Sequence, residues 1–307
     1  MRVAAVVVNW NGGEDNLLCL ESLYAQGATL ERVFFVDNAS CDGSWERVVA
    51  RFPQVELLRN ARNLGFGAGA NLGIAAALRA GAEAVLLVNN DVTLAAGALA
   101  TLAGALETHR EAGLVGPRVL LRSAPGRIWA AGGRLTWRQN LTTLIGHGQP
   151  DGERWQRTFA VDYLTGCALL VRREVFEHVG AFDADFFAYS EDVDLGLRAA
   201  RAGFRSLLVG EASALHAPSS ATGGGYSPRR KYMMGVNSIW FLRRWGGPRE
   251  WLRFLFFDVA PLPGLCLLGL PRGRARGVCA KALGIWDGLR GRRVTAERLA
   301  PGSCWLW

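Results

Sequence analysis

The sequence predicts an α/β protein in which a mixed, mostly parallel sheet is flanked by helices, with a helical extension at the C-terminus. From residue 3 to about residue 120, short runs rich in β-branched residues alternate with helical stretches. These runs are continuously apolar, which is typical of parallel strands covered on both faces by crossover helices. With 307 residues and 50% hydrophobic composition, the chain can form one large core.

The expected elements follow one another in a regular order. The predicted strands of the first part are VAAVVV, RVFFVD, VELLRN and EAVLLVNND, and the helices after them are EDNLLCLESLYAQ, DGSWERVVARF, GAGANLGIAAALRAG and AAGALATLAGALETH. Between residues 121 and 160 the periodicity fades while Gly, Arg and Trp accumulate, so we expect an irregular insert there. VDYLTGCALLVRREVFEHVGAF then predicts a strand and a short helix, and RSLLVG predicts a further strand.

The same pattern indicates how the chain is divided. We expect one domain over residues 1–226, with halves at 1–120 and 121–226, and a helical, basic extension over 227–307. The glycines and serines of SALHAPSSATGGGYSPRRKY, around the start of this extension, predict a mobile loop.

Charge and cysteine usage restrict the partners and the compartment. The formal net charge of +8 favours an anionic partner, which could be nucleic acid, a phosphorylated small molecule or a membrane surface. The six cysteines are scattered, without a C-x-x-C pair or histidines at zinc-site spacing, which is typical of reduced, cytoplasmic proteins. The six-residue apolar run from Val3 to Val8 is too short for a signal sequence and predicts a buried strand.

Amide and carboxylate residues gather just beyond the predicted strands. Each taken singly is a common helix cap or turn residue. Ligands of parallel sheets bind beyond the carboxyl ends of the strands, so the recurrence of this chemistry favours a binding rim. The rim residues are Asn9, Trp10, Asn11, Asp37, Asn38, Asn60, Asn63, Asn89, Asn90 and Asp91.

The glycine-rich stretch NLGFGAGANLG offers an alternative interpretation. Gly65, Gly67 and Ala70 satisfy the G-x-G-x-x-G/A spacing of dinucleotide-binding loops, and Glu83 lies where a ribose-binding carboxylate is expected. That loop turns directly out of a strand, however, whereas residues 61–64 intervene here. The glycines more readily explain close packing of a helix start against a ligand or the sheet.

Acidic residues at two places in the sequence, and one histidine, could carry chemistry. Asp91 ends a buried apolar run, where it could cap a helix or contribute a carboxylate to Mg²⁺ or Mn²⁺ bound to a diphosphate. His216 follows another predicted strand and is a candidate second ligand, although a single histidine is more often structural. In FFAYSEDVDLGLRAARAGF, Glu191, Asp192 and Asp194 place three carboxylates within four residues.

Taken together, the motifs closely resemble the family 2 glycosyltransferases, especially the bacterial rhamnosyltransferase-like branch. The resemblance runs in order from about residue 3 to 245 through VVVNWNG, FFVDNASCDGS, RNLGFGAGANLGI, LLVNNDVTL, LTGCALLVRREVFEHVGAFDADFFAYSEDVDLGLRAARAGF and LHAPSSAT. It implies a GT-A fold and transfer of a sugar from a nucleotide-diphosphate donor with inversion at the anomeric carbon. Residues 1–120 then form the nucleotide-binding half and residues 121–226 the acceptor-side half.

The resemblance also implies roles for individual residues. Asn9, Asn11 and Asp37 line the nucleoside pocket, with Asp37 on the base, and Arg62 and Asn63 lie near the donor. Trp10, Asn38, Gly67 and Asn90 belong to the same donor-binding set. Asp91 holds a divalent metal, with His216 as a further ligand. Asn89 replaces the first carboxylate of the family's D-x-D motif, which implies weak or dispensable metal binding.

The acidic stretch acquires different roles for its three carboxylates. By the resemblance, Asp192 is the general base and Glu191 its supporting neighbour. Asp194 is instead expected to stabilise the helix and pair with Arg198 at i, i+4. Helical spacing puts Asp192 on an open face with Gly196 and Ala199, whereas Val193, Leu197 and Ala200 form the packing stripe.

Two features of the C-terminal part complete the expectations. Val236 stands where the family usually has an arginine before Asn237, so Arg229 or Arg230 takes over its role, or the role is lost. WLRFLFFDVAPLPGLCLLGL is strongly apolar but is interrupted by charges and prolines, so we expect no clean membrane crossing. An interfacial segment on anionic lipid and a buried helix pair with a basic face remain equal alternatives.

The sequence therefore predicts a cytoplasmic, inverting glycosyltransferase, peripheral at the inner membrane face if the segment binds lipid. Its partners are a nucleotide-diphosphate sugar such as dTDP-L-rhamnose, a polysaccharide or lipid-linked glycan acceptor, and no nucleic acid. Two alternatives stay open. A sugar-phosphate nucleotidyltransferase should open with a G-x-G-T-R-type loop, which NWNGGEDN is not, and a catalytically silent sugar-nucleotide-binding protein should lack a placed base.

Overall fold

The computed structural model describes residues 1–218 and 227–307, so residues 219–226 of the predicted mobile loop lie outside these ranges. The ends of the predicted loop belong to β12 (Arg205–His216) and α7 (Pro228–Trp245) instead. The chain forms two compact units. The sheet unit comprises Met1–Arg134, Leu144–Asp183 and Asp192–Pro218. The helical unit comprises Leu135–Thr143, Ala184–Glu191 and the described part of Ser219–Trp307.

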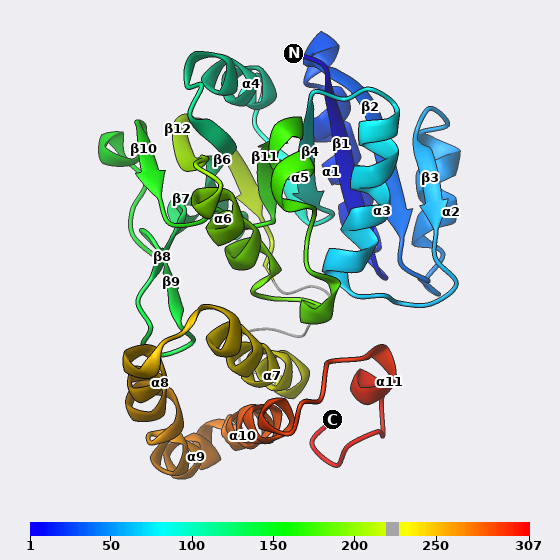
Figure 1. Cartoon of the computed structure of the whole chain (residues 1–307). Coiled ribbons are helices and arrows are strands. Elements are labelled where there is room, and N and C mark those ends of the chain that lie inside the picture. The colour runs from blue at the N-terminus through cyan, green and yellow to red at the C-terminus, as the bar shows by residue number, and fades with distance from the viewer. Residues whose placement is uncertain (219–226) are drawn as a thin grey trace. The chain divides into compact units, whose positions relative to one another are not determined.

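The sheet unit contains a mixed sheet, shown in Figure 1, with ten strands in the described part of the chain. The order of its main path is β10-β12-β6-β11-β4-β1-β2-β3, while β5 pairs with β12 and β7 with β6. The strands are β1 (Val3–Asn9), β2 (Leu30–Asp37), β3 (Glu56–Arg59), β4 (Ala84–Asn89), β5 (Val92–Leu94), β6 (Ala112–Leu121), β7 (Ala124–Ala130), β10 (Thr158–Val161), β11 (Ala168–Arg172) and β12 (Arg205–His216). The β4-β1-β2-β3 part is parallel, and β11 joins it antiparallel to β4.

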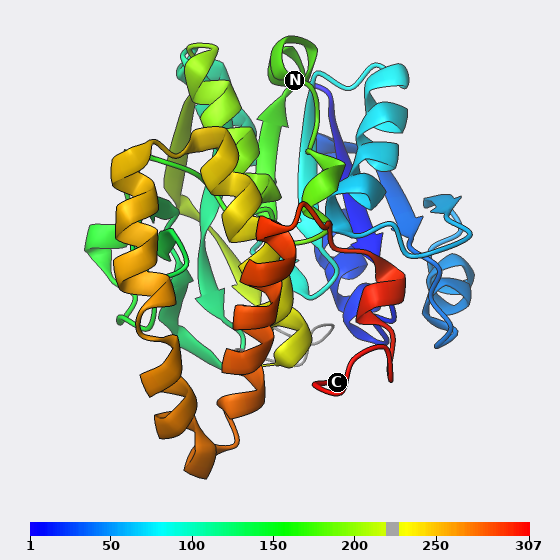
Figure 2. The same ribbon diagram turned by 60° about the horizontal axis from the view of Figure 1, so that its bottom comes forward.

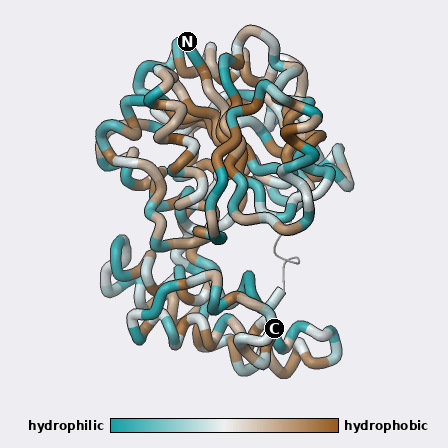
Figure 3. The backbone as a smooth tube through the Cα atoms, turned by 90° about the vertical axis from the view of Figure 1, so that its right-hand side faces the viewer, coloured by the Kyte–Doolittle hydropathy of each residue, from teal (hydrophilic) through white to brown (hydrophobic). Residues whose placement is uncertain are grey.

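Alternate residues of the strands support two hydrophobic layers, as expected for a doubly covered sheet. Val3, Ala5 and Val7 pack on α1 (Asp15–Tyr24), α2 (Ser44–Arg51) and α4 (Ala98–Thr108). Ala4, Val6 and Val8 face α3 (Phe66–Arg79), α5 (Arg173–Val179) and α6 (Glu191–Arg201) on the other side. The resulting apolar centre appears as the brown strands of Figure 3.

Glycines bring α3 unusually close to the sheet. A Cβ atom on Gly73 would lie 2.3 Å from Cγ1 of Val6, and one on Gly69 would lie 3.2 Å from Cγ1 of Val8. The helix begins at Phe66, well beyond the end of β3 at Arg59. The glycine-rich stretch therefore serves close helix–sheet packing, and the strand-to-helix turn of a dinucleotide loop is not formed.

The expectation of an irregular insert at residues 121–160 was wrong. This region contains β7, β10, the short helix η2 (Glu153–Trp155) and a two-stranded sheet of β8 (Gly133–Leu135) and β9 (Thr142–Leu144). Ile128 and Trp155 are buried in a small cluster of their own. Strands of three to seven residues separated by glycine turns are too short to give a recognisable period, which explains the error.

The helical unit is built around two helices in close contact. These are α7 (Pro228–Trp245) and α10 (Ala275–Leu289), and they are joined by α8 (Pro248–Phe254), the π-helical turn η4 (Leu255–Val259), α9 (Leu262–Gly269) and η5 (Leu270–Arg272). A Cβ atom on Gly284 would lie 2.1 Å from the carbonyl oxygen of Tyr232, so this crossing requires glycine. The chain ends after α11 (Ala296–Leu299).

Val236, the residue in place of the family's arginine, is fully buried in the core of this unit. Its position on α7 faces α10, since a Cβ atom on Gly284 would lie 3.1 Å from the backbone nitrogen of Val236. An apolar side chain is what this contact needs. Arg229 and Arg230 lie in the first turn of α7, and their substitution for the missing arginine stays a prediction.

Candidate active site

The ends of β1 and β2 form the centre of the rim. Asn9 and Asp37 are paired across the two parallel strands, and both side chains are fully buried. Asn9 Nδ2 donates to Asp37 Oδ1 at 3.0 Å and to Ser44 Oγ at 2.8 Å. Asn9 Oδ1 accepts from Asn90 Nδ2 at 3.3 Å, so three of the predicted residues belong to one network.

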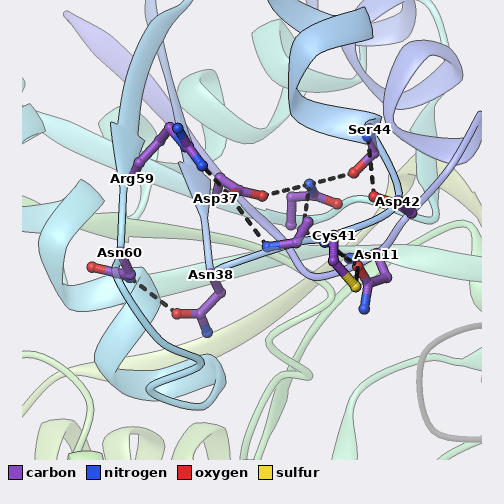
Figure 4. Close-up of polar contacts among 10 residues, drawn as sticks. Asn11, Asp37, Asn38, Cys41, Asp42, Ser44, Arg59 and Asn60 are labelled. Carbon is purple, nitrogen blue, oxygen red and sulfur yellow. Dashed lines mark hydrogen bonds and ion pairs between the residues drawn. The ribbon is translucent and has the colours of Figure 1, made fainter.

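Asn11 and Trp10 lie at the accessible edge of this network. Asn11 has a left-handed backbone conformation, with φ of 53°, and its Oδ1 accepts a hydrogen bond from the backbone nitrogen of Cys41 at 2.9 Å. Figure 4 shows the side chains of Asn11 and the exposed Cys41 together. Trp10 is exposed. An accessible aromatic ring and amide beside a buried carboxylate are suited to hold a nucleoside.

Arg59 is a rim residue that was not predicted from the sequence. It ends β3, and its Nε lies 3.8 Å from Asp37 Oδ2 (Figure 4). Its guanidinium also stacks 3.8 Å above the ring of Trp45. A signal for it was present, because Arg59 is the last residue of a strand that pairs with β2. Arg62 is exposed in the loop that follows, and its contact with the donor stays a prediction.

Asn38 and Asn63 are engaged in holding the loop between β3 and α3. Asn38 Nδ2 donates to Asn63 Oδ1 and to the carbonyl of Gly65, at 3.0 and 2.9 Å. Asn38 Oδ1 accepts from Asn60 Nδ2 at 3.0 Å. All these groups lie at the predicted rim, but the amide of Asn38 shapes the loop rather than facing solvent. Gly67 is buried in the first turn of α3.

The end of β4 brings Asp91 into contact with His216. Asp91 Oδ1 lies 3.2 Å from His216 Nε2, and both side chains are buried. Register explains the pairing, because β5 begins one residue after Asp91 and pairs its Val92 with His216. Trp129 packs edge-on against the imidazole, with ring centroids 4.3 Å apart, and was not anticipated from the sequence.

These residues have the chemistry to hold a divalent ion. Asp91 and His216 supply one carboxylate and one imidazole, and Asn89 Oδ1 is a buried oxygen without a hydrogen-bond partner in the described chain. Mg²⁺ and Mn²⁺ commonly take few protein ligands when substrate phosphates supply the others. Within residues 1–218 and 227–307 there is no group of three His, Cys, Asp or Glu side chains at metal-binding distance.

Asp192 lies on the first turn of α6, half-buried. Its Oδ2 accepts from the backbone nitrogen of Gly166 at 3.0 Å, and its Oδ1 accepts from that of Val193 at 2.8 Å. Burial raises the pKa of this carboxyl above the ordinary value for aspartate, and the two hydrogen bonds only partly oppose the shift. An oriented carboxylate with a raised pKa is suited to accept a proton.

Asp192 and Asp91 are connected through the turn that contains Cys167. The backbone nitrogen of Asn89 donates to the carbonyl of Cys167 at 2.9 Å, which places the 165–167 turn beside the end of β4. Burial, followed by the charges of Asp91 and Asp192, raises the pKa of the Cys167 thiol to about 12. Both carboxylates thus act electrostatically on one buried thiol.

Asp194 has the role predicted for it. Its Oδ2 lies 2.8 Å from Nε of Arg198, and the carboxylate is fully buried. Arg198 also donates to the carbonyl of Ala181 at 2.7 Å, so the pair ties α6 to the segment after α5.

The helical faces predicted for α6 were partly wrong. Ala199 is fully buried and Ala200 is exposed, the reverse of the expectation. The space beside Gly196 is filled by Tyr163, whose Cβ would lie 3.2 Å from an added methyl group. The small residues therefore allow the segment between β10 and β11 to pack closely against α6. Asp192 is accessible because it lies at the start of the helix.

The segment before α6 is held in an uncommon conformation within the helical unit. Phe187, Tyr189 and Ser190 have φ values of 50°, 73° and 77°, in a region that costs non-glycine residues free energy. Asn237 Nδ2 lies within 2.9 Å of the carbonyl oxygens of Phe186, Ala188 and Tyr189. This amide fixes the turn that ends in the buried Glu191.

A mixed sheet with a polar rim at its parallel strand ends and a carboxylate at the start of α6 defines a class of protein, the GT-A glycosyltransferases. The chain belongs to the glycosyltransferase like family 2, whose model matches residues 1–231.

Relatives agree with this assignment. The chain is 33% identical over 238 residues to the N-acetylglucosaminyl-diphospho-decaprenol L-rhamnosyltransferase of Mycobacterium tuberculosis, covering 71% of this chain and 76% of the relative. The solved mannosyltransferase PcManGT from Pyrobaculum calidifontis, in complex with GDP-Man and Mn²⁺, has the same fold with a TM-score of 0.58 and 17% identity, covering 95% of this chain and 88% of that one.

A second solved structure shares the fold over a smaller part of its length. GalNAc-T7 with UDP, GalNAc and Mn²⁺ has a TM-score of 0.56 and 13% identity, over 78% of this chain. The match spans 51% of GalNAc-T7, about half its length.

Proposed function

We propose that the protein is an inverting glycosyltransferase that transfers L-rhamnose from dTDP-L-rhamnose to a polysaccharide or lipid-linked glycan. The donor sugar and the acceptor class are supported by the similarity to the mycobacterial rhamnosyltransferase. The chemistry is supported by one observation above the others, the oriented, half-buried carboxylate of Asp192 at the rim.

Each part of the rim has a task in this reaction. Asn9, Asn11 and Asp37 hold the nucleoside, with Arg59 balancing the charge of Asp37 and Trp10 covering the ligand. Arg62, Asn63, Gly67 and Asn90 belong to the donor side, and Asn38 shapes the loop that carries Asn63. Asp91 and His216 would hold a divalent ion, which would neutralise the charge that develops on the leaving diphosphate.

Asp192 acts on the acceptor. A sugar hydroxyl is a poor nucleophile until its proton is removed, and Asp192 accepts this proton as the hydroxyl oxygen attacks the anomeric carbon. The hydrogen bond from Gly166 keeps the carboxylate oriented, and Glu191 supports the start of α6. The bond to the diphosphate breaks on the opposite face of the sugar, which gives inversion.

The enzyme acts in the cytoplasm, and with a lipid-linked acceptor it works as a peripheral protein at the inner face of the membrane. The domain over residues 1–226 carries the reaction, with residues 227–307 as its extension. The nucleotidyltransferase alternative has no specific support in the rim.

A thermal-shift screen of nucleotide sugars with and without Mn²⁺ tests the donor, because a ligand that binds the native state raises the melting temperature. dTDP-L-rhamnose should give the largest shift, and product formation should follow when an acceptor with a free hydroxyl is added. Binding without turnover of any donor would favour the silent binding protein instead. If no donor raised the melting temperature, the proposal would be wrong.

A further inference from the structure

A strongly apolar, exposed stretch of the described chain lies on the helical unit, along Pro248–Arg272. This 25-residue helical stretch is long and apolar enough to cross a membrane, and only 17% of its most apolar window is buried. Figure 2 shows the chain passing through α8 and α9 and returning along α10. The charged residues and prolines within this stretch do not end the helical structure. Its exposed apolar face therefore needs an explanation.

The exposed face has the spacing of an amphipathic helix. Leu252, Leu255 and Phe256, at i, i+3 and i+4, are 64%, 54% and 71% exposed. Phe254 and Asp258, on the opposite side, are buried. Further along the stretch, Leu267, Leu268 and Leu270 are also more than half exposed. We call these six exposed side chains, from Leu252 to Leu270, the apolar strip.

The carboxylate within the stretch is turned away from the strip. Asp258 forms a buried ion pair with Lys281 of α10, and Lys281 Nζ also donates to Asn140 Oδ1 at 2.9 Å. Asp258 is the only acidic residue in the sequence from 251 to 286. The pair therefore removes the one negative charge from the strip and anchors the stretch to the unit.

Positive charge borders the strip at both ends. The sequence from 248 to 276 contains five arginines, all of them exposed: Arg249, Arg253, Arg272, Arg274 and Arg276. An apolar face flanked by arginines matches the interfacial region of a bilayer with anionic headgroups, where apolar side chains enter the acyl boundary and cations remain at the phosphates. A second copy of the chain would instead bring two arginine borders together, which electrostatic repulsion opposes.

We infer that the apolar strip is a membrane-docking surface that lies flat in the interface of an anionic bilayer. The buried side of the stretch, with Phe254 and the Asp258–Lys281 pair, keeps it attached to the helical unit and excludes a crossing. This membrane contact would serve the proposed function. It rests on the proposed function only for the choice of membrane face. Lipid binding is measured without donor or acceptor, so the two can fail separately.

Vesicle flotation of the full-length protein tests the inference. Phosphatidylcholine vesicles containing phosphatidylglycerol should float the protein at low salt, whereas pure phosphatidylcholine vesicles should float much less of it. Phe256→Ser combined with Leu267→Ser should weaken partitioning by about tenfold or more, since each buried apolar side chain contributes substantially to insertion. Leu18→Ser combined with Leu72→Ser, at exposed leucines of the sheet unit, is the matched control and should leave partitioning unchanged.

The arginines are tested by charge removal. Arg272→Gln, Arg274→Gln and Arg276→Gln together should weaken binding to anionic vesicles by on the order of a hundredfold. The control is Arg51→Gln, Arg79→Gln and Arg110→Gln, three exposed arginines of the sheet unit. If both sets of variants lost vesicle binding equally, the effect would come from net charge alone. That result would overturn the role of the apolar strip.

Two further results would overturn the inference. Protein that stays with the vesicles after alkaline carbonate extraction would be inserted across the bilayer. A vesicle-free dimer that Phe256→Ser and Leu267→Ser convert to monomer would assign the strip to self-association. Melting temperatures equal to that of the unmodified protein show that the variants are folded, because the substituted side chains are exposed.

Discussion

Asp192 and Asp194 lie two residues apart on α6 but have opposite surroundings. Asp192 receives two hydrogen bonds from backbone nitrogens, whereas Asp194 is paired with the guanidinium of Arg198. Asp192→Asn should abolish most turnover, by about 10²-fold or more, because the base is lost. Asp194→Asn should retain turnover but lower the free energy of unfolding by about 1–3 kcal/mol, because Arg198 loses a charged partner.

Comparing kcat and the melting temperature of these two variants separates the roles. Because burial raises the pKa of Asp192 in the folded state, its ionised form is disfavoured there. The favourable contribution of this group to stability is present below the unfolded-state pKa and is lost as pH rises through the folded-state pKa. Asp192→Asn should therefore be at least as stable as the unmodified protein at neutral pH. A pair of variants with equal kcat would contradict the assignment.

The raised pKa of Asp192 also predicts the acid limb of the pH–rate profile. The base is active only when ionised, so kcat/KM should fall as the pH decreases through a pKa above the usual aspartate value of about 3.9. Asp194→Asn, with Asp192 intact, should keep this limb at the same pH. An acid limb at or below the ordinary aspartate value would show that burial does not act on the base in solution.

At the scale of single elements, α3 and α4 offer a matched pair of glycines. Gly73→Ala brings a Cβ atom within 2.3 Å of Val6 on β1 and should lower the free energy of unfolding by about 1–3 kcal/mol. Gly104→Ala, also in a helix interior, meets open space and should raise it by up to about 1 kcal/mol. Urea denaturation measures both, and a stabilising Gly73→Ala would contradict close packing of α3 on the sheet.

The elements also show what the sequence could predict. Three of the four strand–helix repeats were recognisable because β1, β2 and β4 contain continuous buried apolar runs, whereas β3 is short and only partly buried. The strands of residues 121–160 were not recognisable, since they are too short to give a recognisable period. The helical period of α6 was predicted correctly, but its buried and open faces were not. Ala199 and Ala200 are the same residue type and differ only in what packs against them.

At the scale of the whole molecule, ligand binding should appear as global stabilisation. Donor and Mn²⁺ together, at about 100 times Kd, should add roughly 2.7 kcal/mol to the free energy of unfolding. Asp91→Ala should remove the part that depends on Mn²⁺. Glu83→Ala, at the opposite edge of the sheet where it pairs with Arg2, should keep it. Full activity of Asp91→Ala in the presence of a chelator would take Asp91 out of its metal role.

The candidate site could be anticipated to a similar extent as the fold. Strand-end positions located the rim, because the carboxyl ends of parallel strands share one edge. The Asn9–Asp37 contact follows from register, and the Asp194–Arg198 pair from helical spacing. Arg59 and Trp129 were missed because their contacts depend on which strands become neighbours and on which way the side chains point. The spacing of residues along the sequence does not show either property.

The thiols of the sheet unit differ in a way that has a practical use. Cys19 and Cys167 are buried, and burial raises the pKa of both, so they should resist alkylating reagents. Cys41 is exposed and lies beside Asn11, where we propose that the nucleoside binds. A fluorophore attached to Cys41 would therefore report nucleotide arrival directly, and protection of this thiol from labelling would map the donor pocket without any added acceptor.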